Sequence, residues 1–259
     1  MTLRNALLGL LAATLLAMVA AIIVIVADSD GGSNPPAVEE RCDSLRTPSV
    51  SAAACAERED DPRLPGTYVP SQGRSHFPGA AARHTPTPFC DGVSHAGASG
   101  QPTTAGPLPT PAFPASNCYA SNPPTSGKHL NVQRDVDAGN GALINIPPDP
   151  DVYPDDIEIP RDAIPHILEH AGVFVGWNCV AGDAECLKVV ERLKSIASDR
   201  LDSGDRVVMA HDNDLPLGDI GLAAWTRVDT FSYRDFTDDR AVRFIEAHSC
   251  RFDPEGFCR

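Results

Sequence analysis

An unbroken run of uncharged, mostly apolar side chains near the N-terminus, residues 6–27, most limits what this chain can fold into. At about 1.5 Å per helical residue, the run covers a hydrocarbon core of roughly 30 Å, so it predicts a transmembrane helix. A cleaved signal peptide has a shorter apolar region, about 7–15 residues, and a small-x-small cleavage site, which is not evident before Asp28. An uncleaved signal anchor is therefore favoured, with a cleaved signal as the alternative.

The charges on either side of this run predict its orientation. Arg4 lies in the short N-terminal stretch 1–5, whereas Asp28 and Asp30 follow the run. Because positive charge is retained on the cytoplasmic side, the C-terminal bulk is expected outside the cytoplasm, in the periplasm or the extracellular space.

The cysteines fit that compartment. The chain has eight, an even number: Cys42, Cys55, Cys90, Cys118, Cys179, Cys186, Cys250 and Cys258. None has Cys-x-x-Cys spacing, which argues against a thioredoxin-type motif or a cysteine zinc knuckle, so disulfides are expected. Eight cysteines allow about 105 connectivities, and proximity alone favours Cys179 with Cys186 and Cys250 with Cys258.

The formal net charge of −14 bears on partners. Binding to a phosphate backbone needs a basic face, and the sequence shows no basic cluster. Nucleic acid is therefore not an expected partner. The expected membrane contact is the N-terminal helix, and the sequence does not identify a protein partner.

Composition divides the rest of the chain into three parts. Residues 28–38 read as a polar linker, and residues 39–117 are rich in Pro, Gly and Ala. The second part has few aliphatic residues, so its order would depend on cysteine staples and on packing against a folded body. Residues 118–259 have the composition of a globular domain.

Apolar periodicity within 118–259 predicts alternating strands and helices. The expected strands are 142–146, 172–178, 206–210 and 220–228, and the expected helices are 183–202 and a final helix with Ala241, Phe244, Ile245 and His248 on one face. This order predicts an α+β fold with a small mixed sheet packed with helices, preceded by the transmembrane helix and the stapled segment.

The stretch His166-Ile-Leu-Glu-His170 has the spacing of a metal site. In a helix, residues i and i+4 share a face, whereas in a strand they would lie about 13 Å apart, too far for one ion. A helical turn is therefore required. Pro165 suits its first turn, and Asp162 is the expected cap.

The same five residues match the His-x-x-Glu-His motif of inverzincin proteases, in which Glu169 would be the general base. Against this, Gly172 and a strand-forming run follow immediately, where the protease motif needs a long helix. Two histidines held by local hydrogen bonds, with Glu169 in a salt bridge, are the structural alternative.

A second stretch, Pro123-Pro-Thr-Ser-Gly-Lys-His129, forms a stiff loop that would present His129. Together with His166-x-x-Glu-His170 it resembles the bacterial DUF3105 proteins, a membrane-anchored or secreted family of unknown function. The similarity covers about residues 117–250 and includes Ala223-Ala-Trp-Thr-Arg227. Two departures are Ala171 and Thr226, where the family tends to have glycine.

The resemblance also implies a histidine upstream of the proline loop, and His76 in Gly73-Arg-Ser-His76 is the best match. The expected metal ligands are then His76, His129, His166 and His170, a set that suits zinc or copper. His84 and His95 are expected to be exposed, His211 to be solvated and His248 to lie at the edge of the core.

These observations favour an extracytoplasmic, membrane-anchored module that binds zinc or copper. One alternative is a metal-dependent hydrolase with Glu169 as the base. The other is a disulfide-stabilised interaction domain without metal.

Overall fold

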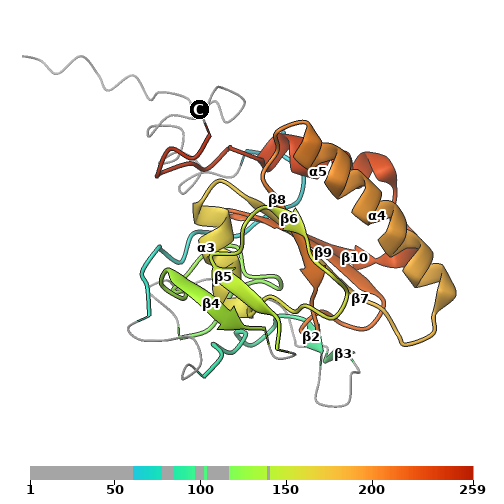
Figure 1. Ribbon diagram of the computed structural model, residues 1–259, viewed down its shortest axis with the longest axis horizontal. Helices are drawn as coiled ribbons and strands as arrows, with labels where there is room; N and C mark the ends of the chain where they lie inside the picture. The colour runs from blue at the N-terminus through green and yellow to red at the C-terminus, as the bar shows by residue number, and fades with distance from the viewer. Residues whose placement is uncertain (1–60, 78–84, 97–101, 104–116, 139–140, 259) are drawn as a thin grey trace, which may run out of the picture. The chain divides into compact units, whose positions relative to one another are not determined.

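The computed structural model describes residues 61–77, 85–96, 102–103, 117–138 and 141–258 (Figure 1). The predicted anchor and linker, together with Cys42, Cys55 and His84, lie outside these ranges. Among the described residues, no helix combines the length and the apolar character needed to cross a membrane.

A six-stranded mixed sheet forms the centre of the fold. Its strand order is β1 (Thr67–Tyr68), β10 (Arg227–Ser232), β9 (Asp219–Ala224), β7 (Val173–Asn178), β8 (Val207–His211) and β6 (Asp151–Val152). The pairs β7–β8 and β8–β6 are parallel and the others are antiparallel. Two small sheets pair β4 (Gln133–Asp137) with β5 (Leu143–Ile146) and β2 (His95–Ala96) with β3 (Pro102–Thr103). The predicted α+β class is confirmed.

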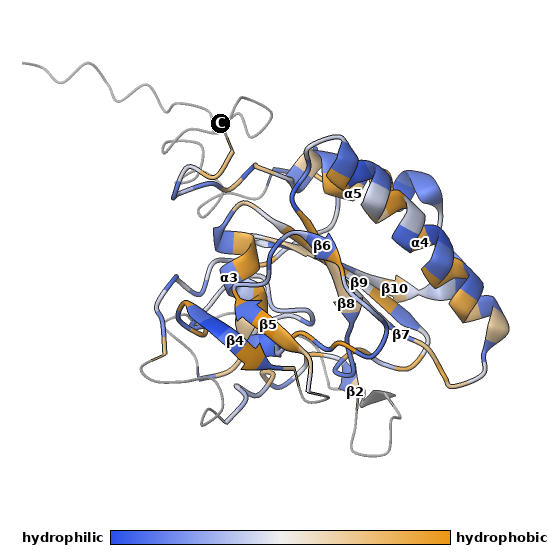
Figure 2. Cartoon of the chain, viewed as in Figure 1, coloured by the Kyte–Doolittle hydropathy of each residue, from blue (hydrophilic) through white to orange (hydrophobic). Residues whose placement is uncertain are grey.

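Helices α4 (Ala184–Asp202) and α5 (Asp238–His248) cover one face of this sheet (Figure 1). Asp183 caps α4 by accepting hydrogen bonds from the backbone N–H groups of Glu185 and Cys186, and Gly204 ends it in the left-handed conformation. The apolar stripes of α4 and α5, visible as orange bands in Figure 2, pack on Val173, Val175 and Trp177 of β7.

The short helix α3 (Ile164–Glu169) lies on the opposite face, preceded by the 3₁₀ turn η2 (Arg161–Ala163). Ile164, Ile167 and Leu168 pack there with Phe174 of β7, the β5 side chains and Phe252. Strand β7 is thus buried on both faces, as its continuous apolar composition predicts. The 3₁₀ turn η3 (Tyr233–Asp235) joins β10 to α5.

Two expectations about local structure were wrong. The predicted strand 220–228 is two antiparallel strands, β9 and β10, joined at Trp225-Thr226, because Thr226 has a φ of 63° and reverses the chain. Asp162 does not cap α3. Its carboxylate accepts hydrogen bonds from the Thr87 N–H and the Tyr119 hydroxyl instead.

Three disulfides join described cysteines: Cys90–Cys118, Cys179–Cys186 and Cys250–Cys258. The last two are the predicted pairs. The first ties the proline-rich segment to the start of the globular domain. Leu64, Val69 and Val93 of that segment are buried, so it contributes to the core.

A glycine in β9 seats the loop that carries His129. A Cβ on Gly221 would come within 2.6 Å of the Pro123 ring, and one on its β7 neighbour Gly176 would come within 2.9 Å of Phe174 and 3.1 Å of Asp212. Pro123 can therefore pack against the sheet only because Gly221 has no side chain.

We predict that Gly221→Ala destabilises the fold by about 2–3 kcal/mol, because the added methyl group must displace Pro123. Gly204→Ala is the control. An added Cβ at Gly204 would meet no atom, but the residue has a positive φ, so this variant should lose about 1 kcal/mol of stability. Denaturant unfolding measures both, and equal costs would show that Pro123 is not seated by the glycine.

Candidate metal centre

The segment 72–77 brings His76 to the centre by pairing with the loop before His129. The backbone N–H of Gly127 donates to Gly73 O at 2.9 Å, that of His129 to Ser75 O at 3.0 Å, and that of Phe77 to His129 O at 2.7 Å. His76 and His129 are therefore partners in a parallel β-bridge, although they are far apart in the sequence.

The loop that carries His129 is held by hydrogen bonds to the β9–β10 turn and within the loop itself. The Thr226 N–H lies 3.3 Å from Thr125 O, and the Thr230 hydroxyl donates to Asn122 O at 2.7 Å. The Tyr119 hydroxyl lies 2.7 Å from Lys128 O. The proline loop and the β9–β10 turn are thus in direct contact.

Helix α3 supplies the remaining two side chains. His166 and Glu169 are three residues apart and share one face of the helix. One ligand atom from each of four residues, His76, His129, His166 and Glu169, lies within 4.8 Å of the others.

Hydrogen bonds to the backbone orient two of the imidazoles. His129 Nδ1 lies 2.8 Å from Gly127 O, and His166 Nδ1 lies 2.8 Å from Leu130 O. A carbonyl oxygen only accepts, so each Nδ1 carries a proton, and in the neutral ring each Nε2 then has a lone pair. Metal-binding histidines are commonly held in this way.

The centre is almost closed. His129, His166 and Glu169 are 0%, 1% and 3% exposed, whereas His76 is exposed. His129 Nε2 and Glu169 Oε2 lie 3.0 Å apart, yet neither forms a well-oriented hydrogen bond within the described chain. A lone pair facing a carboxylate oxygen is repulsive, and a proton or a metal cation between them removes that repulsion.

Burial also sets the protonation of the cluster. Desolvation, with help from His129, lowers the pKa of His166 to about 3, and desolvation and His129 also lower the pKa of His76. For Glu169 desolvation raises the pKa, but the stronger combined effect of His129 and Arg74 lowers it. Neutral His76 and His166 and an ionised Glu169 are the states that bind a metal ion.

His170, the other predicted ligand, lies beside this group but is not a member of it. Helix α3 ends at Glu169, and His170 is its C-cap residue, outside the group of four candidate ligands. Its ring centroid lies 4.6 Å from that of His166. Its Nε2 lies 3.2 Å from Glu255 Oε2.

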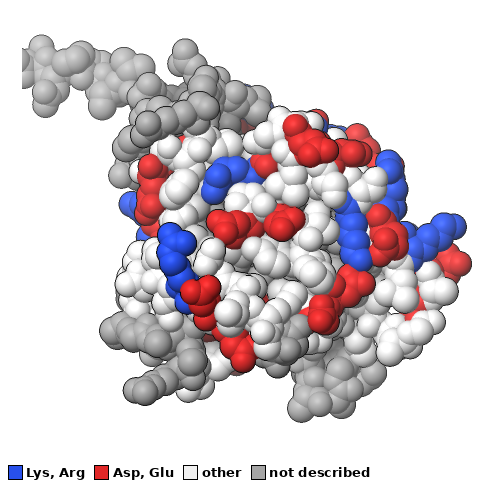
Figure 3. All heavy atoms as spheres, in the orientation of Figure 1, with Lys and Arg blue, Asp and Glu red and all other residues white. Residues whose placement is uncertain are grey.

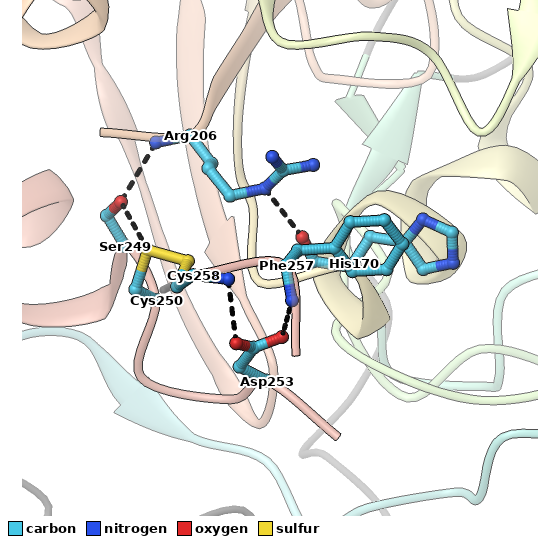
Figure 4. Close-up of a disulfide and its surroundings, with 7 residues drawn as sticks. All are labelled: His170, Arg206, Ser249, Cys250, Asp253, Phe257 and Cys258. Atoms are coloured by element: carbon cyan, nitrogen blue, oxygen red, sulfur yellow. Dashed lines mark hydrogen bonds between the residues drawn. A yellow bond between two sulfur atoms is a disulfide. The ribbon is translucent and has the colours of Figure 1, made fainter. Parts of the chain in front are cut away.

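The C-terminal loop fixes this position (Figure 4). Phe257 stacks on the His170 ring at 4.2 Å, and the Arg206 Nε–H donates to His170 O at 2.8 Å. The Cys250–Cys258 disulfide closes the loop that bears Phe257. Desolvation, offset in part by Glu169, lowers the pKa of His170 to about 4.

The other described histidines lie apart from the centre. His248 is fully buried with its Nε2 2.9 Å from Pro65 O, so it lies deeper than the predicted edge of the core. The predictions that His95 is exposed and His211 solvated were wrong. His95 is half-buried with its Nδ1 against Val93 O, and His211 is half-buried against Trp177.

Three imidazole nitrogens and one carboxylate oxygen fit zinc or copper. Ligands bound at about 2.0–2.2 Å in a tetrahedron are roughly 3.4 Å apart. The four atoms, all within 4.8 Å of one another, would need to close by only about an ångström. No family model, curated protein or solved structure matches the chain.

The sequence did not single out Arg74, which lies next to the centre. Its Nη1 is 3.5 Å from Glu169 Oε1. The only sequence signal for a place of Arg74 near the centre is that it lies two residues before His76, because alternate residues of an extended segment lie on the same side.

A second buried carboxylate has a strongly perturbed pKa. Asp212 follows β8 and is 3% exposed, and its Oδ2 is buried without a hydrogen-bond partner among the described residues. Burial, reinforced by Asp214, raises the pKa of Asp212 to about 7.

Because the folded state holds this proton more tightly than the unfolded state, Asp212 weakens the fold as pH rises from about 4 to 7. We predict that Asp212→Asn is more stable than the parent at pH 8, by at most about 4 kcal/mol, and gains little at pH 4. Urea unfolding at both pH values measures this, and a pH-independent difference would contradict it.

Proposed function

We propose that this protein is a metal-binding module in which His76, His129, His166 and Glu169 hold one zinc or copper ion. The observation that carries the proposal is the buried contact between His129 Nε2 and Glu169 Oε2, two groups with no well-oriented hydrogen bond. The backbone-fixed rings of His129 and His166 support it, since their Nδ1 protons are already used.

We further propose that the module works outside the cytoplasm, attached to the membrane by residues 6–27. The apolar run supports an anchor, and three disulfides suit an oxidising compartment. Membership of the DUF3105 family, based on the proline loop and the His-x-x-Glu-His stretch, is part of the same proposal.

The hydrolase alternative uses Glu169 as a general base, which requires a carboxylate that is not bound to the metal. The Glu169 side chain is 5% exposed and faces His129, and this position favours direct binding of its carboxylate to the metal. The metal-free alternative leaves His129 and Glu169 to share a proton. Metal content distinguishes it from the proposal.

We predict about one zinc or copper ion per full-length chain. His166→Ala should lower metal affinity at least tenfold, because it removes a ligand whose orientation the backbone has already fixed. His211→Ala is the matched control and should keep the metal. Elemental analysis measures content, with circular dichroism to verify folding. A metal-free parent, or a folded His166→Ala protein with unchanged metal content, would overturn the proposal.

A second pair of variants tests which side chain is the fourth ligand. Glu169→Gln should weaken metal binding, because a neutral amide replaces an ionised carboxylate, whereas His170→Ala should have little effect. Competition with a chromophoric chelator measures both affinities. The reverse order would identify His170 as the ligand and return Glu169 to the role of base.

A further inference from the structure

His76 differs from the other members of the centre in its exposure to solvent. His129, His166 and Glu169 are at most 3% exposed, whereas His76 lies at the surface. A solute that approaches an ion at the centre therefore reaches it on the side of His76, because the other three groups are closed off from solvent.

His76 is also the histidine of this group whose ring the backbone does not hold. His129 Nδ1 and His166 Nδ1 each lie 2.8 Å from a carbonyl oxygen. Within the described part of the chain, no hydrogen bond reaches the His76 ring. It only contacts the two other rings, at centroid distances of 4.5 Å to His129 and 5.0 Å to His166. Of the three imidazoles, His76 is therefore the one that can leave an ion without breaking a hydrogen bond that orients it.

The backbone around His76 stays in place when its side chain rotates. The Phe77 N–H donates to His129 O at 2.7 Å, and the His129 N–H donates to Ser75 O at 3.0 Å. These hydrogen bonds join main-chain atoms on either side of His76 and do not involve its ring. The ring can thus swing away from the centre and return by the side-chain rotation that exposed residues readily make, while the segment that carries it remains folded.

The charges of the molecule favour the approach of cations. The net charge is −14, and Asp and Glu side chains are spread over the face shown in Figure 3, with Lys and Arg between them. Such a field steers cations toward the protein. At the opening, desolvation and His129 lower the pKa of His76, and the charges of Glu169 and Glu255 oppose this shift. The Glu255 side chain is 45% exposed, so an arriving cation meets its carboxylate beside His76.

We infer, on the basis of the proposed metal site, that the ion is exchanged through His76 with a second protein that presents a histidine. The bond between the ion and the His76 nitrogen breaks, and a neutral imidazole nitrogen of the second protein takes that position. Imidazole is a ligand that suits zinc and copper, so one ligand replaces another of the same kind. Neither a proton nor an electron is transferred, and the charge of the ion is unchanged.

The protein is then a metal carrier with two kinds of ligand. His129, His166 and Glu169 hold the ion persistently, and His76 is the replaceable ligand. The ion bridges the two proteins before it passes from one to the other.

Free imidazole stands in for the histidine of the second protein in the test. The full-length protein is loaded with Co²⁺, whose visible spectrum reports the ligands of the ion. We expect His76→Ala to bind Co²⁺ through the three buried ligands, with a spectrum that differs from that of the parent. Imidazole should restore a parent-like spectrum with saturation, because the vacated position is open to solvent.

His166→Ala is the matched variant, since it removes the same side chain from a closed position. It should bind Co²⁺ about tenfold more weakly than His76→Ala, because it loses a ring that the backbone has already oriented. Imidazole should not restore its spectrum, because His166 is 1% exposed. His211→Ala, which changes a histidine outside the centre, is the control and should behave as the parent. Circular dichroism verifies that each variant folds.

The rate of metal transfer gives a readout in the parent itself. The chromophoric chelator pyridylazoresorcinol takes Zn²⁺ from the loaded protein, and the rate should rise with chelator concentration, because the incoming nitrogen replaces His76 before the ion leaves the buried ligands. In His76→Ala the rate should be higher by about tenfold or more, the range by which loss of one group at a metal site changes its affinity.

The outcomes separate the two proposals. Failure of the parent to bind Co²⁺ and Zn²⁺ would overturn the metal site and, with it, the exchange. If the parent binds normally, the exchange alone is overturned by a His76→Ala protein that loses the ion as completely as His166→Ala, that ignores imidazole, or that shows the parent spectrum without it. A transfer rate that does not depend on chelator concentration has the same consequence.

Discussion

The burial of two imidazoles beside an apolar core is the constraint on which the rest of the structure depends. A buried polar group must be hydrogen-bonded, and the partners of both Nδ1 atoms, Gly127 O and Leu130 O, flank His129 in one short stretch. Leu130 N–H in turn donates to Asp162 O just before α3. The stretch 127–130 therefore sets the orientation of the His129 ring on the loop and of the His166 ring on the helix. A small shift of this stretch would turn the Nε2 atoms of both rings away from the centre.

This stretch can hold its position because it is anchored on three sides. Pro123 occupies the space left by Gly221, the Thr226 N–H pairs with Thr125, and the segment 72–77 forms a ladder along the outer side. Of these contacts, only the ladder includes members of the four-residue cluster, His76 and His129. Together they give the centre a fixed geometry that does not depend on the short helix α3 alone, which is too short to be stable in isolation.

Sequence reasoning found the parts of the centre whose signal is local. The helical turn after Pro165, the stiff loop before His129 and the two short-range disulfides follow from spacing and turn chemistry. It gave Glu169 the role of a general base or salt-bridge partner and not of a ligand, because helical spacing puts Glu169 on the face of His166 but does not show that His129 lies opposite. His170 could not be placed either, because Glu255 and Phe257 hold it from the far end of the chain.

Two turns next to the centre hold non-glycine residues in the left-handed conformation. Ala171 and Thr226 have positive φ, 66° and 63°. Each such residue costs about 1–2 kcal/mol, so its surroundings must hold the backbone in place. Cys250 N–H donates to Ala171 O, and Thr226 N–H pairs with the proline loop. At Ala171 this backbone turns the chain from α3 into β7, and at Thr226 it turns β9 into β10 beneath the loop that carries His129.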